Sequence, residues 1–229
     1  MDKNSSFLII VTEGDNLKGV AFFSGGKDGL YALHLAEMRG IDVPYLLALK
    51  TTIGLSPHWE NLEALKTLAE AMRKELLTFD MREGSDALAE FIGSLGVDYL
   101  IAGDVLLEDH LKWIELLSEK AGVKPFEPLW GKNMRELAEE MLKTGFEYAM
   151  IAVNKEKLGK EWLGYTFRSV DDLEFFLRKN PNIDPVGEFA EFHTVVLKCP
   201  LFEGSFGLDP LDVKEGETYW WMKFRLVRE

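Results

Sequence analysis

The residues with the clearest chemical potential form the turn 24–29, which reads Ser-Gly-Gly-Lys-Asp-Gly. An apolar run at 20–23 leads into this turn, and a helix-like run at 30–39 follows it. A glycine-rich turn between a strand and a helix brings backbone N–H groups and the positive end of the helix dipole to an anion. Lys27 adds a full positive charge. The turn therefore predicts a phosphate site and, through it, nucleotide binding.

The spacing within this turn narrows the kind of nucleotide site. A Walker A loop needs Gly six residues before its lysine and Ser or Thr after it, but Ala21 and Asp28 hold those places. The pattern Ser-Gly-Gly-x-Asp instead resembles the PP-loop of the ATP pyrophosphatases, which split ATP between its α and β phosphates. The alternative is a plain strand-to-helix turn in which Lys27 and Asp28 are solvated charges.

The composition favours a globular protein of one large or two small domains. The chain has 229 residues, and 47% of them are hydrophobic, which supports a full core. The net charge of −13 argues against a broad, sequence-independent grip on nucleic acid. The single Cys199 excludes an internal disulfide framework, and the apolar run at 7–11 is too short for a signal sequence or a membrane span. We expect a soluble cytoplasmic protein.

Strand and helix signals alternate through the first half of the chain, which predicts a parallel sheet wrapped by helices. We expect strands at 20–23, 45–50, 75–79 and 99–102, helices at 30–39, 61–73, 85–95 and 109–120, and an extra strand at 7–11. Prolines 125 and 128 and Gly131 mark a boundary. Beyond it we expect helices at 133–143 and 169–179 and strands at 148–153, 194–198 and 218–227, with Ser85 and Ser169 as helix N-caps. The predicted architecture is a Rossmann-like α/β domain at 1–125 and a smaller α+β domain at 126–229.

Further polar residues follow the predicted strands, where ligands bind in open parallel sheets. Thr51 and His58 come after the second strand, and Gly103 and Asp104 come after the fourth, ahead of His110 and Lys112. Thr51 is a candidate for adenine or ribose contacts. The alternatives are a packed loop histidine at position 58, a helix-capping residue at position 104 and surface residues at positions 110 and 112.

Two carboxylates in the second half form a separate candidate group. Glu188 and Glu191 lie within four residues of each other, which would suit a cationic substrate group or a general base. The alternative is a polar turn before a strand. A zinc site is not expected, because Cys199 has no partner cysteine and the histidines lack ligand spacing.

Taken together, these segments resemble the diphthine–ammonia ligase family, a branch of the ATP pyrophosphatases with an adenine nucleotide alpha hydrolase-like fold. The likeness runs in order from residue 20 to residue 202. Besides the phosphate turn, His58 and the Gly103 segment, it includes Pro128-Leu129-Trp130, Trp162-Leu163-Gly164 and the Gly187–Thr194 segment. The order of the motifs favours Glu188 and Glu191 as substrate-site residues.

The chain departs from the family pattern at several positions. Gly29 stands where Ser is usual, Phe189 and Ala190 replace a Gly pair, Lys112 stands near a frequent Arg, and His193 replaces an acidic or polar residue. These departures leave ATP binding expected. They bear mainly on the identity of the acceptor.

The resemblance implies an amide-forming reaction. ATP would convert a carboxylate into an acyl-adenylate with release of pyrophosphate, and ammonia would then displace AMP. The implied ligands are ATP, Mg²⁺ and ammonium, and the implied protein substrate is elongation factor 2 carrying diphthine. No stable nucleic-acid partner and no membrane are expected, and a homodimer is one possible assembly.

The predicted site follows from these motifs. The predicted catalytic residues are Lys27, Asp28, Glu188 and Glu191, with Asp28 also as the Mg²⁺ ligand. The predicted nucleotide-binding residues are Phe23, Ser24, Gly25, Gly26, Lys27, Asp28, Gly29, Thr51, His58, Gly103, Asp104, His110 and Lys112. No covalent nucleophile is needed, so Cys199 is expected to be structural.

Two other functions fit parts of this pattern. One is a tRNA-modifying ATP pyrophosphatase, such as a thiolase or a lysidine synthase, against which the acidic charge and the lone cysteine count. The other is a nucleotide-binding module that catalyses no reaction. This alternative remains because Gly29 stands where the family usually has Ser.

Overall fold

A five-stranded parallel sheet forms the first half of the chain in the computed structural model, which describes residues 16–51 and 56–229. Its strands are β1 (Lys18–Phe22), β2 (Asp42–Lys50), β3 (Glu75–Asp80), β4 (Tyr99–Ile101) and β5 (Lys124–Phe126). Their order is β3-β2-β1-β4-β5, and every neighbouring pair is parallel. This arrangement confirms the predicted Rossmann-like sheet. The strand predicted at 7–11 lies outside the described residues.

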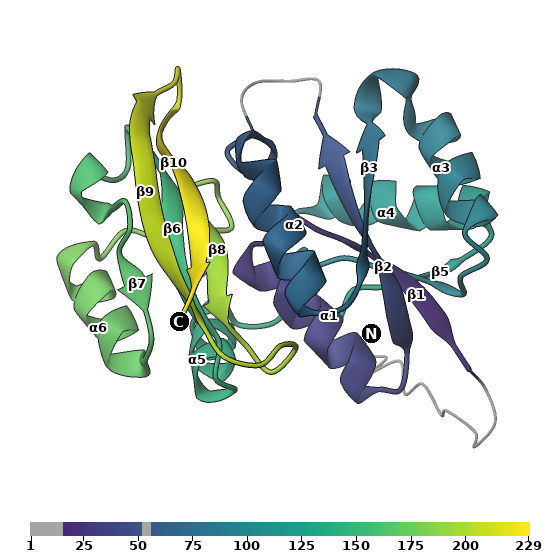
Figure 1. Cartoon of the computed structure of the whole chain (residues 1–229), viewed down its shortest axis with the longest axis horizontal. Coiled ribbons are helices and arrows are strands. Elements are labelled where there is room, and N and C mark those ends of the chain that lie inside the picture. The colour runs from purple at the N-terminus through teal and green to yellow at the C-terminus, as the bar shows by residue number, and fades with distance from the viewer. Residues whose placement is uncertain (1–15, 52–55) are drawn as a thin grey trace, which may run out of the picture.

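Helices cover both faces of this sheet (Figure 1). They are α1 (Lys27–Met38), α2 (Leu62–Ala71), α3 (Ser85–Ser94) and α4 (Glu108–Ala121), with short 3₁₀ turns at Trp59–Asn61 and Met81–Glu83. Helices α3 and α4 pack on the outer face, where Ile92 and Ile114 join Val20 and Leu100 in one apolar cluster. Helices α1 and α2 lie between the first sheet and a second one (Figure 1).

The second sheet is antiparallel and belongs to the second half of the chain. Its strands are β6 (Glu147–Asn154), β7 (Thr166–Phe167), β8 (Phe192–Lys198), β9 (Phe206–Glu215) and β10 (Tyr219–Arg228). The order is β7-β6-β10-β9, and β8 pairs with β6. Helices α5 (Met134–Lys143) and α6 (Val170–Lys179) and a 3₁₀ turn at Lys160–Trp162 complete this half. The predicted α+β character is confirmed.

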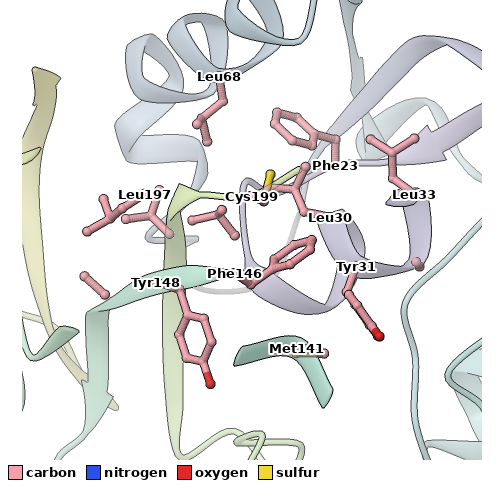
Figure 2. Packing of buried hydrophobic residues seen from close by; sticks show 14 of the residues in the cluster. Phe23, Leu30, Tyr31, Leu33, Leu68, Met141, Phe146, Tyr148, Leu197 and Cys199 are labelled. Carbon is pink, nitrogen blue, oxygen red and sulfur yellow. The ribbon is translucent and has the colours of Figure 1, made fainter. Parts of the chain in front are cut away.

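One apolar core joins the two halves. Leu30 and Leu68, from α1 and α2, pack in the same cluster as Phe146 and Leu197 from the second half (Figure 2). Because interiors are close-packed, this shared core fixes the second sheet against the start of α1. The domain boundary at 125/126 stays a prediction.

Three local expectations were wrong or incomplete. Gly84, not Ser85, is the N-cap of α3, and the Ser85 hydroxyl instead accepts a hydrogen bond from Trp113 Nε1 at 3.2 Å. Strand β5 was not predicted because Pro125 was interpreted as a boundary; it is an edge strand, where proline is tolerated. Strands β7 and β9 were also missed. Ser169 does cap α6, in a capping box with Asp172.

No helix within residues 16–51 and 56–229 combines the length and apolar character needed to cross a membrane.

Candidate active site

The phosphate turn connects β1 to α1, as expected. Helix α1 begins at Lys27, three residues earlier than predicted, with Gly26 as an N-cap that provides no side-chain hydrogen bond. The first turn of α1 therefore consists of the motif residues themselves. Because the N-cap itself offers no side chain, backbone N–H groups of the first turn remain for an anion. Gly25 has φ of +73°, a left-handed conformation that favours glycine.

The turn is enclosed by side chains from several elements. Phe23 is buried in the core, and the Ser24 hydroxyl accepts a hydrogen bond from Gly26 N at 3.4 Å. A Cβ atom at Gly25 would lie 2.7 Å from Leu65 of α2. A Cβ at Gly29 would meet only the Phe22 carbonyl oxygen, at 3.3 Å. The glycines at 25 and 29 therefore differ: the first has a left-handed conformation that favours glycine, and the second does not.

Gly103 brings the end of β4 directly against the start of α1. A Cβ atom at this position would lie 2.7 Å from the backbone carbon and oxygen of Asp28. Real Cβ atoms do not approach backbone so closely, so this position requires glycine. The structure thus gives Gly103 a packing role beside the phosphate turn.

Strand β8 of the second half forms one wall of the turn. Val196 N donates to Gly25 O at 2.9 Å, and Lys27 N donates to Thr194 Oγ1 at 3.3 Å. These bonds place the segment 186–194, which carries the predicted acceptor residues, against the phosphate turn.

The Lys27 side chain points into the second half and is only 2% exposed. Its ammonium group donates to Asp28 Oδ2 at 2.7 Å and to the Val186 carbonyl oxygen at 2.5 Å. It also lies 5.5 Å from the centre of the Phe192 ring and 6.0 Å from that of Tyr148. The predicted phosphate-binding lysine is therefore held by an acidic and aromatic environment in this structure.

Asp28 is a partly buried carboxylate at the junction of the two halves. Burial raises the pKa of Asp28, and the neighbouring Lys27 opposes this rise. Oδ2 binds Lys27, while Oδ1 is buried without a hydrogen-bond partner. Mg²⁺ takes one or two carboxylates from the protein and its other ligands from phosphates and water, so the free oxygen of Asp28 fits that need. Across the described part of the chain, no group of three or more His, Cys, Asp or Glu residues is arranged to hold a metal ion.

Glu188 ties the acceptor segment to the loop after β4. Its Oε1 accepts hydrogen bonds from Val105 N at 3.1 Å and from Leu106 N at 2.8 Å. Burial raises the pKa of the Glu188 carboxyl; the two backbone bonds lower it, and the charges of Asp28 and Asp104 raise it further. Glu188 therefore holds two loops together, and its carboxyl interacts electrostatically with Asp28 and Asp104.

Glu191 is buried more deeply and has a different partner. Only 4% of the residue is exposed, and its Oε1 pairs with Lys157 at 3.4 Å. Oε2 is buried without a partner. Burial raises the pKa of Tyr219, and the charge of Glu191 adds to this rise.

Two histidines face each other across the junction. The rings of His58 and His193 meet edge to face with centroids 5.3 Å apart, and His58 hydrogen-bonds to the Ser24 backbone. Burial, aided for His58 by the His193 charge and for both by Lys27, lowers the pKa of His58 to about 3 and that of His193 to about 4. Both imidazoles are therefore neutral at pH 7 and lie next to the phosphate turn, where His58 was predicted.

The outer predicted residues are more exposed. Asp104 Oδ1 lies 3.0 Å from Nδ1 of His110, whose side chain is 61% exposed. Lys112 is 64% exposed and pairs with Glu108 on its own helix at 3.7 Å. Thr51 follows β2 and is exposed. The structure brings these residues to the same sheet edge but not into contact with Lys27, and their nucleotide role stays a prediction.

Sequence reasoning missed two residues of this region. Tyr148, on β6, is fully buried, and its hydroxyl has no hydrogen-bond partner. Burial and the Asp28 charge raise its pKa. Position 148 was predicted to begin a strand, and the sequence carries no signal of what this tyrosine faces.

Glu127 follows the unpredicted strand β5, next to the end of β4. Burial, together with the charges of Asp104 and Glu115, raises its pKa to about 8. Its Oε2 is buried without a partner. Recognition of β5 as a fifth parallel strand would have placed Glu127 at the ligand-binding edge.

Comparisons with known proteins give consistent results. Residues 17–125 match the family described as "Diphthamide synthase N-terminal domain", and residues 133–228 match "Diphthamide synthase C-terminal domain". The diphthine–ammonia ligase of Schizosaccharomyces pombe is 30% identical over 102 residues, which are 44% of this chain and 17% of that protein. The Homo sapiens protein of the same name is 25% identical over 118 residues, 51% of this chain and 44% of that protein. The matched part is thus less than half the length of these curated relatives.

Two solved structures are similar to parts of this chain. A 4-thiouridine synthetase in complex with RNA and bound ATP has a TM-score of 0.41 at 14% identity. The match covers 57% of this chain and 41% of the synthetase chain. A predicted subunit of tRNA methyltransferase from Methanocaldococcus jannaschii has a TM-score of 0.45 at 14% identity. The match covers 80% of this chain and 98% of that subunit.

Proposed function

Because the chain belongs to the diphthamide synthase family, we propose that it is an ATP-dependent ligase that activates a carboxylate and transfers ammonia to it. The family resemblance inferred from the sequence motifs is thereby confirmed. One observation carries the proposal: the second half lies directly on the phosphate turn, through Val196 N to Gly25 O and Lys27 N to Thr194 Oγ1. An acceptor bound by the second half would therefore meet a nucleotide bound by the first.

The phosphate turn supplies the groups that the first step needs. Adenylation of a carboxylate places new negative charge on the departing pyrophosphate. The positive N-terminal end of α1 and the Lys27 ammonium would stabilise that charge. Lys27 must turn away from Val186 to do so. Asp28 would hold Mg²⁺, which when bound supplies further charge neutralisation at the phosphates.

The acceptor would be diphthine, as the name of the relatives indicates, and the family resemblance implies that elongation factor 2 carries it. Glu188 and Glu191 are the proposed acceptor-side residues, and Glu188 also positions the segment through its two backbone hydrogen bonds. A cytoplasmic location and a homodimer remain parts of the same proposal.

Turnover with the expected acceptor tests this function. The protein would be incubated with ATP, Mg²⁺, ammonium and elongation factor carrying diphthine, with AMP and pyrophosphate measured and the acid-to-amide change followed by mass spectrometry. We expect AMP formation that depends on the acceptor, and its loss in Lys27→Ala and Asp28→Ala with circular dichroism unchanged. Lys66→Ala, an exposed lysine of α2 paired with Glu63, is the matched control. Release of ADP, or full AMP formation by Lys27→Ala, would contradict the proposal.

A further inference from the structure

The His58 ring lies against the part of the phosphate turn where an anion would bind. It hydrogen-bonds to the Ser24 backbone, and its Cε1 atom lies 3.7 Å from the position that a Cβ on Gly26 would take. Gly26 is the N-cap of α1, so the ring stands at the helix end whose backbone N–H groups favour an anion. His58 is partly exposed, and a ligand at this helix end can therefore reach it.

The bond to Ser24 determines which ring nitrogen of His58 carries the proton. Burial is the main influence on the pKa of His58 and lowers it, whereas the Ser24 bond acts in the opposite direction. A bond that the ring donates to a carbonyl oxygen has this effect. A neutral imidazole has one N–H donor and one bare acceptor nitrogen, so the second nitrogen of His58 is an acceptor. Cε1 is bonded to both nitrogens, and the second nitrogen therefore also lies close to Gly26.

A phosphate oxygen at the start of α1 would thus meet a nitrogen that has no hydrogen to donate. One added proton changes this repulsion between two acceptors into a charge-assisted hydrogen bond. We propose that His58 takes up one proton from solvent when the nucleotide binds, and that its second ring nitrogen then donates to a phosphate oxygen. The proton returns to solvent when the nucleotide leaves. This inference rests on the nucleotide site of the proposed function and adds a proton to its binding step.

The surroundings of His58 hold the ring neutral while no nucleotide is present. The His193 ring of β8 meets it edge to face with centroids 5.3 Å apart, and the Lys27 cation of α1 acts on both rings. Lys50 of β2 lies 5.9 Å from the ring of the residue that follows His58, and Tyr219 of β10 contacts His193 at 5.0 Å. Among the described residues, no carboxylate contributes to the pKa of either histidine. The phosphates would therefore bring the negative charge that His58 lacks.

His193 limits the uptake to one proton. Burial lowers the pKa of His193 to about 4, so this ring is neutral at pH 7, and a charge on one ring opposes a charge on the other. A carboxylate at position 193 would have the opposite effect, because it would hold a proton on His58 whether or not a nucleotide is bound. Residue 193 therefore decides whether nucleotide binding is coupled to a proton.

The coupling makes nucleotide affinity depend on pH. Burial lowers the pKa of free His58 to about 3, and a phosphate beside the ring raises it. Between these two pKa values the complex holds one proton more than the free protein, so affinity rises as the pH falls. We expect the Mg²⁺ complex of α,β-methylene-ATP, which cannot be split between the α and β phosphates, to bind about tenfold more tightly at pH 6 than at pH 8.

Calorimetry in buffers of different ionisation enthalpy counts the protons that accompany this binding. His58→Asn retains an amide N–H but has no titratable ring. At pH 6 it should take up about one proton fewer than the wild type and bind at least tenfold more weakly. The difference between the two proteins decides, because Asp28, whose pKa burial raises, would release a proton to Mg²⁺ in both. His34→Gln is the matched control, since the His34 ring contacts Phe146 in the core and should not affect the uptake.

NMR shows which ring carries the proton, since the chain has only four histidines. The Cε1–H signal of His58 should titrate below about pH 5 in the free protein and above about pH 6 in the complex. His193→Glu is the second variant. Its His58 should be protonated without nucleotide at pH 6, so binding should remain while the proton uptake is lost. A His58 titration that the nucleotide leaves unchanged, or wild-type uptake in His193→Glu, would overturn the proposal.

The result also separates the proton from the function on which it rests. If the wild type binds no nucleotide analogue, the phosphate site is wrong, and the ligase proposal and the proton uptake are wrong with it. If the analogue binds with equal proton uptake in the wild type and His58→Asn, only the proton uptake by His58 is wrong. Acceptor-dependent AMP formation then still tests the ligase function.

Discussion

The backbone of Gly103 lies directly against the carbonyl group of Asp28, with no room for a side chain between them. A Cβ atom on Gly103 would come within 2.7 Å of that carbonyl oxygen and within 2.8 Å of Gly29 N. The end of β4 and the first turn of α1 are thus fixed by this contact. The position of the phosphate turn depends on it.

Gly103→Ala should therefore displace the phosphate turn and weaken ATP binding at least tenfold, with a loss of stability of about 1–3 kcal/mol from overpacking. Gly29→Ser is the contrasting variant, because a Cβ there meets only the Phe22 carbonyl oxygen at 3.3 Å. We expect Gly29→Ser to bind ATP as tightly as the wild type or more tightly. Calorimetry with ATP and thermal unfolding measure both effects. Equal ATP affinity in Gly103→Ala and the wild type would contradict the packing interpretation.

The paired histidines predict a loss of stability in mild acid. On folding, the pKa of His193 falls from its usual 6.5 to about 4, and that of His58 falls to about 3. At a pH below 6.5 and above these lowered values, the unfolded chain therefore binds more protons than the folded chain. The free energy of unfolding must then decrease as the pH falls from about 7 towards 4. His193→Phe keeps a ring against His58 and should lose about 2 kcal/mol less than the wild type between pH 7.5 and 5.

Urea unfolding at the two pH values measures this difference. His110→Gln, at an exposed histidine outside the pair, is the control and should follow the wild type. A pH dependence that is identical in wild type and His193→Phe would show that the pair does not titrate as inferred.

Glu127 predicts the opposite pH dependence. Its pKa rises from 4.5 to about 8 on folding, so the folded chain binds the extra proton in this range. Stability contributed by the protonated carboxyl is present at low pH and is lost as the pH rises towards 8. Glu127→Gln cannot titrate and should gain on the order of 2 kcal/mol relative to the wild type between pH 5 and 8. Parallel stability curves for the two proteins would be the contrary result.

Two substitutions of Glu188 separate its positioning from its charge. Glu188→Ala removes the acceptor of two backbone hydrogen bonds and should cost about 1–3 kcal/mol in unfolding free energy. Glu188→Gln retains an oxygen that can accept both bonds, so the fold and ATP affinity should stay close to wild type while the KM for the acceptor rises. Denaturation, ATP titration and acceptor kinetics together test this. If Glu188→Gln lowers ATP affinity as much as acceptor use, the acceptor assignment is wrong.

Cys199 is expected to be inert and structural. The thiol is buried, and burial raises its pKa to about 12, so almost no thiolate is present at pH 8. Ellman's reagent should label Cys199 only after unfolding in denaturant. Cys199→Ala should keep AMP formation, at a cost of about 1 kcal/mol in stability. Rapid labelling of the native protein, or loss of AMP formation in Cys199→Ala, would refute this.

The sequence by itself determined the parallel sheet, the phosphate turn and the family. These are local or ordered signals: glycine spacing between a strand and a helix, alternating strand and helix periodicity, and motifs in a fixed order. Ser169 was predictable as a cap because its capping box spans only three residues. Strand β5 was not predicted because Pro125 was interpreted as a boundary. Proline is excluded only from central strands, and whether a strand is central or at the edge depends on its neighbours in the sheet.

Only the tertiary structure decided what surrounds the reactive groups. Lys27 and Val186 are 159 residues apart in sequence, and no local pattern couples them. The Tyr148 hydroxyl, the neutral state of His58 and His193 and the raised pKa of Glu127 all arise from burial between elements that are distant along the chain. Charge and hydrogen bonding in a site depend on which groups exclude water from it, and that is settled when the second sheet packs onto the start of α1.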